Sequence, residues 1–174
     1  LGTVLPGKLS INISNKQLED SGFADRALTI LADRDPSGVV FELTETAMMR
    51  APEVSIRQME HIQSKGFSWA IDDFGTGYSS LSRLGTLPVT CIKIDKYFID
   101  GLTNNSLSAL MVEAIINIAH KINISVVAEG VETLMQRDAL LKLGCDFIQG
   151  YFYSKPIAGS EIIELLQEKQ VEDA

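Results

Sequence analysis

The sequence predicts an α/β protein of the (β/α)8 TIM-barrel-like class, in which parallel strands alternate with covering helices. Short β-branched runs recur along the whole chain, and a longer helical pattern follows each of them. The runs are apolar on both sides of the pleat, as in parallel strands that are covered on both faces. An open doubly wound sheet is the alternative that the same alternation allows.

Six short runs bounded by turn residues are expected to be strands. Each strand–helix unit takes roughly 20–36 residues, and a complete barrel needs about 250 residues. We therefore expect about two units to be missing ahead of Leu1, which is not a methionine. The expected strands are Leu9–Ser14, Val39–Thr44, Ser68–Asp73, Cys91–Asp95, Ser125–Glu129 and Asp146–Gly150.

The spacing of apolar residues predicts a helix after each of these strands. Pro52 suits a first helical turn, and Gly66 and Gly144 follow expected helix ends. The expected helices are Phe23–Asp33, Pro52–Lys65, Ser79–Leu84, Ser106–Asn123, Thr133–Leu143 and Ser160–Lys169. In the fourth helix, the apolar residues expected to face mostly toward the core are Leu107, Leu110, Met111, Ala114, Ile115, Ile118 and Ile122.

Composition and charge exclude several classes of protein. Hydrophobic residues make up 45% and charged residues 22% of the chain, as in globular proteins. No apolar run is long enough to span a bilayer and no signal peptide opens the chain, so we expect a cytoplasmic protein. A net charge of -8 argues against a nucleic acid polymer as partner. Cys91 and Cys145 form no disulfide framework or zinc motif, and we expect two buried thiols.

Every expected strand carries a polar residue near its C-terminal end. In parallel α/β folds this edge binds ligands, and in barrels it is the catalytic face. Taken singly, Asn12 is equally consistent with a turn, as is Glu129 before a glycine. Glu42 and Glu45 are equally consistent with a solvated pair before a helix. The strand-end residues are Asn12, Ser14, Glu42, Glu45, Asp72, Asp73, Lys93, Asp95, Glu129, Glu132 and Gln149.

The adjacent pair Asp72 and Asp73 is harder to explain without a ligand. Two neighbouring carboxylates directly after an apolar run repel each other, and the pair is costly unless cations compensate it. Lys93 lies between two isoleucines, so its buried ammonium needs a carboxylate partner, which the acidic cluster would supply. Oxygen ligands without thiols or histidines select Mg²⁺, Mn²⁺ or Ca²⁺. Two such ions about 3.5–4 Å apart suit the in-line hydrolysis of a phosphodiester.

The glycine-rich loop at 73–81 is a second signal. Gly75 and Gly77 allow unusual backbone angles or close approach to a ligand. Ser79 and Ser80 then open a helix whose N-terminal amides can bind an anion. An ordinary strand-to-helix loop with an N-cap is the equally supported alternative.

Together these motifs resemble the EAL-domain family of cyclic-di-GMP phosphodiesterases. The matching stretches occur in the family's order and at compatible spacings over nearly the whole chain, so the set is highly specific. They are SINIS at 10–14, FELTET at 41–46, IDDFGTGYSSL at 71–81, IKID at 92–95, VAEGVET at 127–133, and GCD through QGY at 144–151.

The resemblance implies a (β/α)8-type barrel and metal-dependent hydrolysis of cyclic di-GMP to linear pGpG. By the same resemblance, Asn12, Glu42 and Asp72 are ligands of one Mg²⁺ or Mn²⁺ ion. Asp72 would bridge to a second ion, which Asp73 and Glu129 would also bind.

Further roles are implied around the metal ligands. Lys93 would hold or polarise the attacking water, Glu129 is either a metal ligand or the general base, and Gln149 would hydrogen-bond the water or the substrate. Glu132 would support guanine binding or the residues behind the ligands. Glu45 would tether the glycine-rich loop, whose supporting residues are Gly75, Thr76, Gly77, Tyr78 and Ser79.

The Glu-Ala-Leu motif that names the family is absent; in the family it lies upstream of the segment matching Asn12, and its Glu is a metal ligand. We therefore expect residues 1–174 to form an N-terminally truncated EAL-type domain that is inactive by itself. A non-catalytic EAL-type receptor for cyclic di-GMP is the alternative function. An enolase-type barrel is a third reading from the chemistry alone, but Lys93 and Lys96 do not match its Lys-x-Lys strand end. The resemblance also implies a homodimer and allows GGDEF or sensor modules, or a membrane anchor, in the parent chain.

Overall fold

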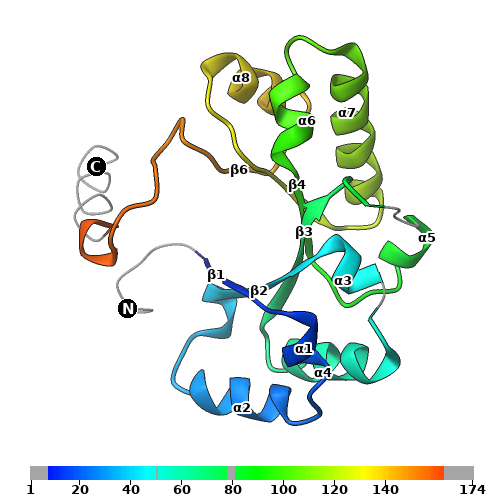
Figure 1. Cartoon of the computed structure of the whole chain (residues 1–174), viewed down its shortest axis with the longest axis vertical. Coiled ribbons are helices and arrows are strands. Elements are labelled where there is room, and N and C mark those ends of the chain that lie inside the picture. Colours follow the sequence, from blue (N-terminus) through cyan, green and yellow to red (C-terminus); the bar gives the residue numbers. More distant parts are fainter. Residues whose placement is uncertain (1–7, 50, 78–80, 163–174) are drawn as a thin grey trace.

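The computed structural model describes residues 8–49, 51–77 and 81–162. Its centre is one parallel six-stranded sheet whose spatial order, β1-β2-β3-β4-β5-β6, follows the chain (Figure 1). The order never reverses, as it would in a doubly wound sheet, so the barrel-like prediction is confirmed. The strands are β1 (Leu9–Asn12), β2 (Val39–Thr44), β3 (Ser68–Phe74), β4 (Cys91–Ile94), β5 (Ser125–Ala128) and β6 (Phe147–Ile148).

The sheet curls, and the helices cover its outer side (Figure 1). The helices are α1 (Asn15–Leu18), α2 (Phe23–Ile30), α3 (Glu45–Met49), α4 (Glu53–Gln63), α5 (Leu81–Leu84), α6 (Lys96–Gly101), α7 (Ser106–Lys121) and α8 (Leu134–Lys142), with a 3₁₀ turn at Pro36–Gly38. Four expected helices correspond to α2, α4, α7 and α8. Of the expected helix 79–84 the structure describes 81–84, and of 160–169 it describes a helical turn at 159–162; the remaining residues of both lie outside the described chain.

Three short helices, α1, α3 and α6, were not predicted. Each follows a strand almost directly, and two have clear local start signals. Ser14 and Gln17 form a capping box at α1, and the Asp95 carboxylate accepts a hydrogen bond from the amide of Tyr97 at α6. Helices of four to six residues are too short to show the apolar periodicity on which the prediction depended.

The outer face of the sheet packs against the helices through large apolar side chains. Phe41 and Trp69 are register partners in β2 and β3, and their rings lie 5.1 Å apart. The indole of Trp69 donates a hydrogen bond to the carbonyl of Met59 in α4, at 3.1 Å. Because side chains alternate along a strand, Glu42 and Ala70 face the opposite, concave side.

The predicted core face of α7 is wrong for most of its residues, although Ile115 is buried as expected. The residues that it buries are Ser108, Val112, Ile115, Ile116 and Ala119. A Cβ on Gly101 would collide with the side chain of Ser108, so α6 and α7 touch at their small residues, and this contact sets the rotation of α7. Leu107, Leu110 and Met111 are turned outward and are 65%, 61% and 39% exposed.

Other expectations concern the cysteines and the membrane. Both cysteines are free thiols, and Cys145 is buried, which raises the pKa of its thiol to about 11. Cys91 is only half-buried, whereas a fully buried thiol was expected. Among the helices that the structure describes, each is too short or too polar to traverse a bilayer.

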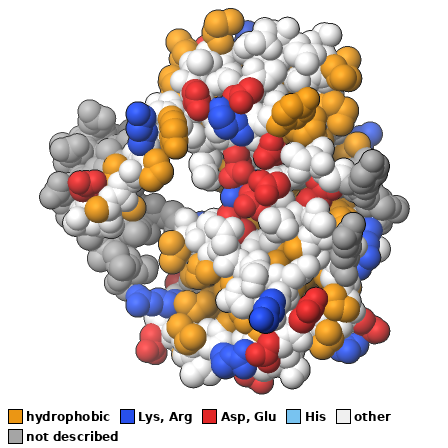
Figure 2. Space-filling view, in the orientation of Figure 1, with side chains coloured by type: hydrophobic (Ala, Val, Ile, Leu, Met, Phe, Trp, Pro, Cys, Tyr) orange, Lys and Arg blue, Asp and Glu red, His pale blue; other side chains and the backbone are white. Residues whose placement is uncertain are grey.

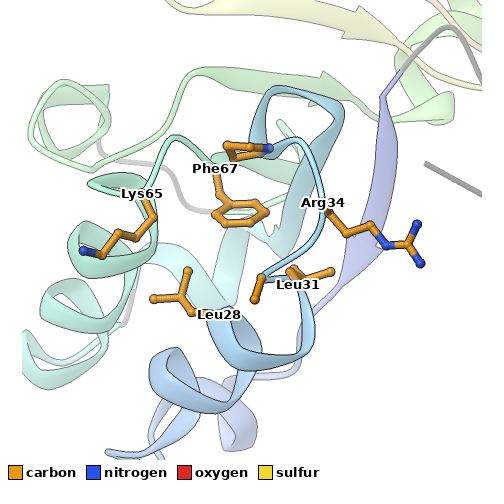
Figure 3. Close-up of a pocket in the computed structure, with 7 residues that line it drawn as sticks. Leu28, Leu31, Arg34, Lys65 and Phe67 are labelled. Carbon is orange, nitrogen blue, oxygen red and sulfur yellow. The ribbon is translucent and has the colours of Figure 1, made fainter. Parts of the chain in front are cut away.

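A cavity of about 310 Å³ opens at the end of the sheet where the strands begin (Figure 3). Phe67 and Pro36, which precede β3 and β2, contribute to its wall, together with Leu28 and Leu31 around the end of α2. It therefore lies at the opposite end of the strands from the predicted polar residues. Ligands of parallel α/β folds bind at the carboxyl ends of the strands, so this cavity is not the candidate active site.

Candidate active site at the carboxyl ends of the strands

One lysine joins acids from three other strands or strand ends. The Lys93 Nζ atom lies 2.7 Å from Glu129 Oε1, 2.9 Å from Glu42 Oε2 and 3.1 Å from Asp72 Oδ1. Lys93 is only 6% exposed and Glu42 only 4%. Acidic side chains gather at the centre of this face, beside the hollow of the curled sheet (Figure 2). The structure therefore brings together residues that are far apart in the sequence.

A β-bulge explains how two consecutive aspartates reach the same site. Ile71 pairs with Ile92 and Phe74 with Ile94, so β3 uses one residue more than β4 over this interval. Asp73 has a positive φ of 54°, which is rare for a residue with a side chain. Consecutive residues of a regular strand point to opposite faces. With the bulge, Asp72 and Asp73 instead offer oxygens that lie within 4.8 Å of each other and of an oxygen of Glu129.

The site contains more negative than positive charge. Burial raises the pKa of Asp73, and the charges of Asp72 and Asp95 raise it further. Burial also raises the pKa of Glu129, although the hydrogen bond from Lys93 opposes this shift. Burial alone would lower the pKa of Lys93, but its hydrogen bonds to Glu129 and Glu42 outweigh burial and raise it, so Lys93 is an ammonium. Among the described residues, the Lys93 ammonium contacts the carboxylates of Glu42, Asp72 and Glu129, and Asp73 lies beside them, so the excess of negative charge favours the entry of further cations.

The donor atoms of the site fit divalent metal ions. Asp72 Oδ1 is buried and accepts no hydrogen bond of acceptable geometry among the described residues, although Lys93 Nζ is 3.1 Å away. Nearly all buried polar atoms in proteins have a partner, so this oxygen is available to a ligand. Asp72, Asp73 and Glu129 provide oxygen atoms only, the donors that Mg²⁺ and Mn²⁺ prefer.

Glu45 holds the glycine-rich loop beside the acids. Its buried carboxylate accepts hydrogen bonds from the amides of Gly75, at 2.7 Å, and Gly77, at 3.3 Å. A Cβ on Gly77 would lie 2.7 Å from a carboxylate oxygen of Glu45, and Gly75 has a φ of 100° and packs against Phe98. The Thr76 hydroxyl donates to the carbonyl of Asp73 at 2.9 Å. Tyr78 and Ser79, also predicted to support this loop, lie outside the described residues.

The remaining predicted residues surround this cluster. Asn12 ends β1 and is the register partner of Glu42, and its side chain is exposed. Gln149 follows β6, and its backbone bonds to Ala128 and Val131 hold it at the same edge of the sheet. Glu132 lies 3.0 Å from the ammonium of Lys96, a partner that was not predicted.

Two residues of this edge received no role in the sequence analysis. Asp95 caps α6 and is close enough to raise the pKa of Asp73. Lys96 begins α6, where a cation is unfavourable because the helix dipole is positive at that end. Hydrogen bonds to Asp100 and Glu132 raise the pKa of Lys96. Because a lysine at the start of a helix is unfavourable, Lys96 directly after the capping Asp95 was the sequence signal from which compensating acids nearby could have been predicted.

Comparison with known proteins gives a single family. The family model described as "EAL domain" matches residues 5–156. MucR of Pseudomonas aeruginosa, a bifunctional diguanylate cyclase/cyclic di-GMP phosphodiesterase, is 36% identical over 157 residues, which are 89% of this chain and 23% of MucR. RocR of the same organism, a cyclic di-GMP phosphodiesterase, is 34% identical over 91% of this chain and 41% of RocR. The chain thus spans less than half the length of either relative.

Solved structures agree with these relatives. The MucR phosphodiesterase in complex with c-di-GMP superposes with a TM-score of 0.84 at 36% identity, covering 89% of this chain and 64% of that one. A manganese and cyclic-di-GMP complex of Klebsiella pneumoniae BlrP1 superposes with a TM-score of 0.78 at 28% identity, covering 86% and 39%. The order of the strands, the acid cluster at their carboxyl ends and these matches lead to one conclusion: the chain belongs to the EAL domain family.

Proposed function

We propose that this chain is part of an enzyme that hydrolyses cyclic di-GMP to linear pGpG with the help of Mg²⁺ or Mn²⁺, in the cytoplasm. The observation that carries the proposal is the bulge that brings oxygens of Asp72 and Asp73 within 4.8 Å of an oxygen of Glu129, while the buried Asp72 Oδ1 faces the Lys93 ammonium at 3.1 Å. A structural ion-pair network would balance acids with cations, whereas Lys93 contacts three carboxylates, and uncompensated buried carboxylates are costly. Similarity to MucR and RocR, both named as cyclic di-GMP phosphodiesterases, supports the choice of substrate.

Two divalent ions are proposed to bind at this edge of the sheet. Asp72, Asp73 and Glu129 are the proposed ligands of one ion, and Asn12, Glu42 and Asp72 of the other, so that Asp72 serves both. Bound ions would lower the pKa of the attacking water and neutralise the phosphate oxygens.

The chain's own groups hold the water and its proton. The Lys93 ammonium donates hydrogen bonds and is fixed by two carboxylates, so it can orient a water molecule beside them. Glu129 is proposed either as a ligand or as the general base; its raised pKa makes it a better proton acceptor than an ordinary carboxylate. Gln149 is proposed to hydrogen-bond the water or substrate, and Glu132 to support guanine binding. Glu45 would hold the glycine-rich loop beside the site through the amides of Gly75 and Gly77.

Assembly is proposed to involve a second copy of the chain. The outward stripe of Leu107, Leu110 and Met111 on α7 is apolar, and exposed apolar stripes often mark interfaces. We also propose that the parent protein carries further signalling domains such as GGDEF or sensor modules, in line with the bifunctional name of MucR.

The function is tested on the complete product of the gene and on residues 1–174 alone. Hydrolysis of cyclic di-GMP to pGpG is followed by chromatography with Mg²⁺ or Mn²⁺, and binding by calorimetry. We expect turnover by the complete product and none by residues 1–174, because among the described strands β1 and β6 each have one unpaired edge, which favours aggregation. Binding without turnover by the complete product would indicate the non-catalytic receptor, and equal turnover by both forms would contradict our account of the site.

A further inference from the structure

Lys96 lies across the loop that follows β5. Its Nζ atom is 2.6 Å from Asp100 in α6 and 3.0 Å from Glu132 in the loop between β5 and α8. The Lys96 side chain is 45% exposed, and exposed ion pairs of this kind contribute little to stability. These contacts therefore matter mainly for the position of the loop between β5 and α8.

The aliphatic stem of Lys96 occupies the space left by a missing side chain. Gly130 has a φ of 69°, and a Cβ at this residue would lie 2.5 Å from Cγ and 2.7 Å from Cδ of Lys96. The stem thus lies against the backbone of the residue that directly follows Glu129. Gly130 is one peptide unit from Glu129, whose carboxylate contacts Lys93.

The other end of the same loop is already fixed. The buried Gln136 side chain accepts hydrogen bonds from the amides of Glu132 and Thr133, both at 2.9 Å. Its amide group donates to the carbonyl of Ile99 in α6, at 3.1 Å. Gln136 therefore holds residues 132–133 to α6, and the amides of Glu129 and Val131 bond to the carbonyls of Ile94 and Gln149. At residue 130 it is the Lys96 stem that contacts the loop from α6.

We propose that Lys96 is a positioning residue for Glu129: its stem seats Gly130 and its ammonium holds Glu132, which fixes the backbone of residues 129–132 against α6. The inference rests on the proposed function, because Glu129 is a ligand or base only if the reaction takes place here. A less well-held Glu129 would lower kcat more than it changes KM, since the substrate's other contacts remain.

The test uses Lys96→Ala, Lys96→Met and Lys96→Arg in the complete gene product, with Arg57→Met as the matched control. Arg57 forms an exposed pair with Glu53 in α4 at 3.2 Å and has no place in the site. Lys96→Ala, which removes the side chain beyond Cβ, should lower kcat about 10-fold or more, as for residues that orient metal ligands. Lys96→Met, which keeps a stem, should lose less. Lys96→Arg should recover most of the activity, and Arg57→Met should match the wild type.

Two measurements do not depend on turnover. Amide hydrogen exchange in residues 129–133 should be faster in Lys96→Ala than in the wild type and Arg57→Met, and the affinity for Mn²⁺ should fall about 10-fold. Unchanged exchange and Mn²⁺ affinity in Lys96→Ala would overturn the inference, as would an unchanged kcat in an active enzyme. If the wild-type protein has no hydrolytic activity but Lys96→Ala still shows faster exchange, the proposed function is overturned. The structural role of Lys96 in holding residues 129–132 is then still supported.

Discussion

Lys93 Nζ and Glu129 Oε1 are 2.7 Å apart, the shortest of the three contacts between this ammonium and the surrounding acids. The two residues lie at the ends of neighbouring strands, β4 and β5, and each changes the pKa of the other. The Lys93 ammonium supplies positive charge among the acids that it contacts, Glu42, Asp72 and Glu129. The stability of the site without metal ions therefore depends on it.

Lys93→Met should destabilise the metal-free protein strongly. Removing one partner of a buried ion pair leaves an uncompensated charge, which typically costs about 3–5 kcal/mol of unfolding free energy. Thermal unfolding of the complete gene product in EDTA measures this loss, with the surface variant Lys142→Met as control. Mn²⁺ should raise the melting temperature of Lys93→Met more than that of the wild type. Equal stability of the three metal-free proteins would show that the acids are not ionised together.

Metal replacement should separate Mg²⁺ and Mn²⁺ from Ca²⁺. The oxygen ligands bind all three ions, but Ca²⁺ is larger and tolerates irregular coordination, whereas the reaction requires tight, near-octahedral geometry. We expect the complete gene product to be active with Mg²⁺ or Mn²⁺ and inhibited by added Ca²⁺. Hydrolysis of cyclic di-GMP in each cation, after removal of bound metal, provides the measurement. Equal turnover in Ca²⁺ would contradict this reasoning.

Asp72→Ala should reduce activity more than Glu132→Ala. We place Asp72 between both ions, whereas Glu132 touches Lys96 at the rim. We expect a loss above about 100-fold for Asp72→Ala and about 10-fold for Glu132→Ala. Rates of pGpG formation are compared after circular dichroism has shown that both variants fold. Losses of the same size would mean that the two residues have been placed wrongly relative to the ions.

Glu45→Gln should loosen the glycine-rich loop. One carboxylate oxygen, Oε2, accepts hydrogen bonds from both backbone amides, and the neutral oxygen of a glutamine amide is a weaker acceptor than this charged oxygen. Activity should fall about 10- to 100-fold, and the amides of residues 75–77 should exchange faster. Glu53→Gln, on the exposed side of α4, serves as control. Unchanged exchange at Gly75 would show that the loop keeps its position without Glu45.

Leu110→Glu should convert the proposed dimer into a monomer. Leu110 is 61% exposed in the middle of the α7 stripe, and a buried charge at an interface is strongly unfavourable. Sedimentation velocity of the complete gene product at micromolar concentration measures the change. Leu134→Glu, at a leucine of α8 that is 51% exposed, should leave the dimer intact. A monomeric wild type would refute this proposal.

The strands and their parallel pairing could be predicted from the sequence, because local patterns determine them. Short β-branched runs in strict alternation with helices can pair only as a parallel sheet, and all six runs became strands. Polar residues at the ends of these runs had to meet at one edge, since parallel strands end on the same side. The sequence therefore predicts that Glu42, Asp72, Lys93 and Glu129 meet at this edge.

The tertiary structure decided what depends on contacts between distant segments. The sequence shows that Asp72 and Asp73 are adjacent, but only the pairing of β3 with β4 contains the bulge that points both toward Glu129. An apolar helix face does not reveal which of its stripes meets the core. The close approach of α6 to Ser108 decided this for α7.

Lys96 illustrates the same limit most clearly. In the sequence it is one lysine beside a capping aspartate, and its partners Gly130 and Glu132 are more than thirty residues away. Local propensities and spacing carry no information about such a distance, because the energy that brings the segments together comes from the packing of the whole sheet. The sequence alone therefore determined which chemical groups lie at the strand ends. Their geometry was decided by the tertiary structure, through the bulge, the rotation of the helix and the contacts across loops.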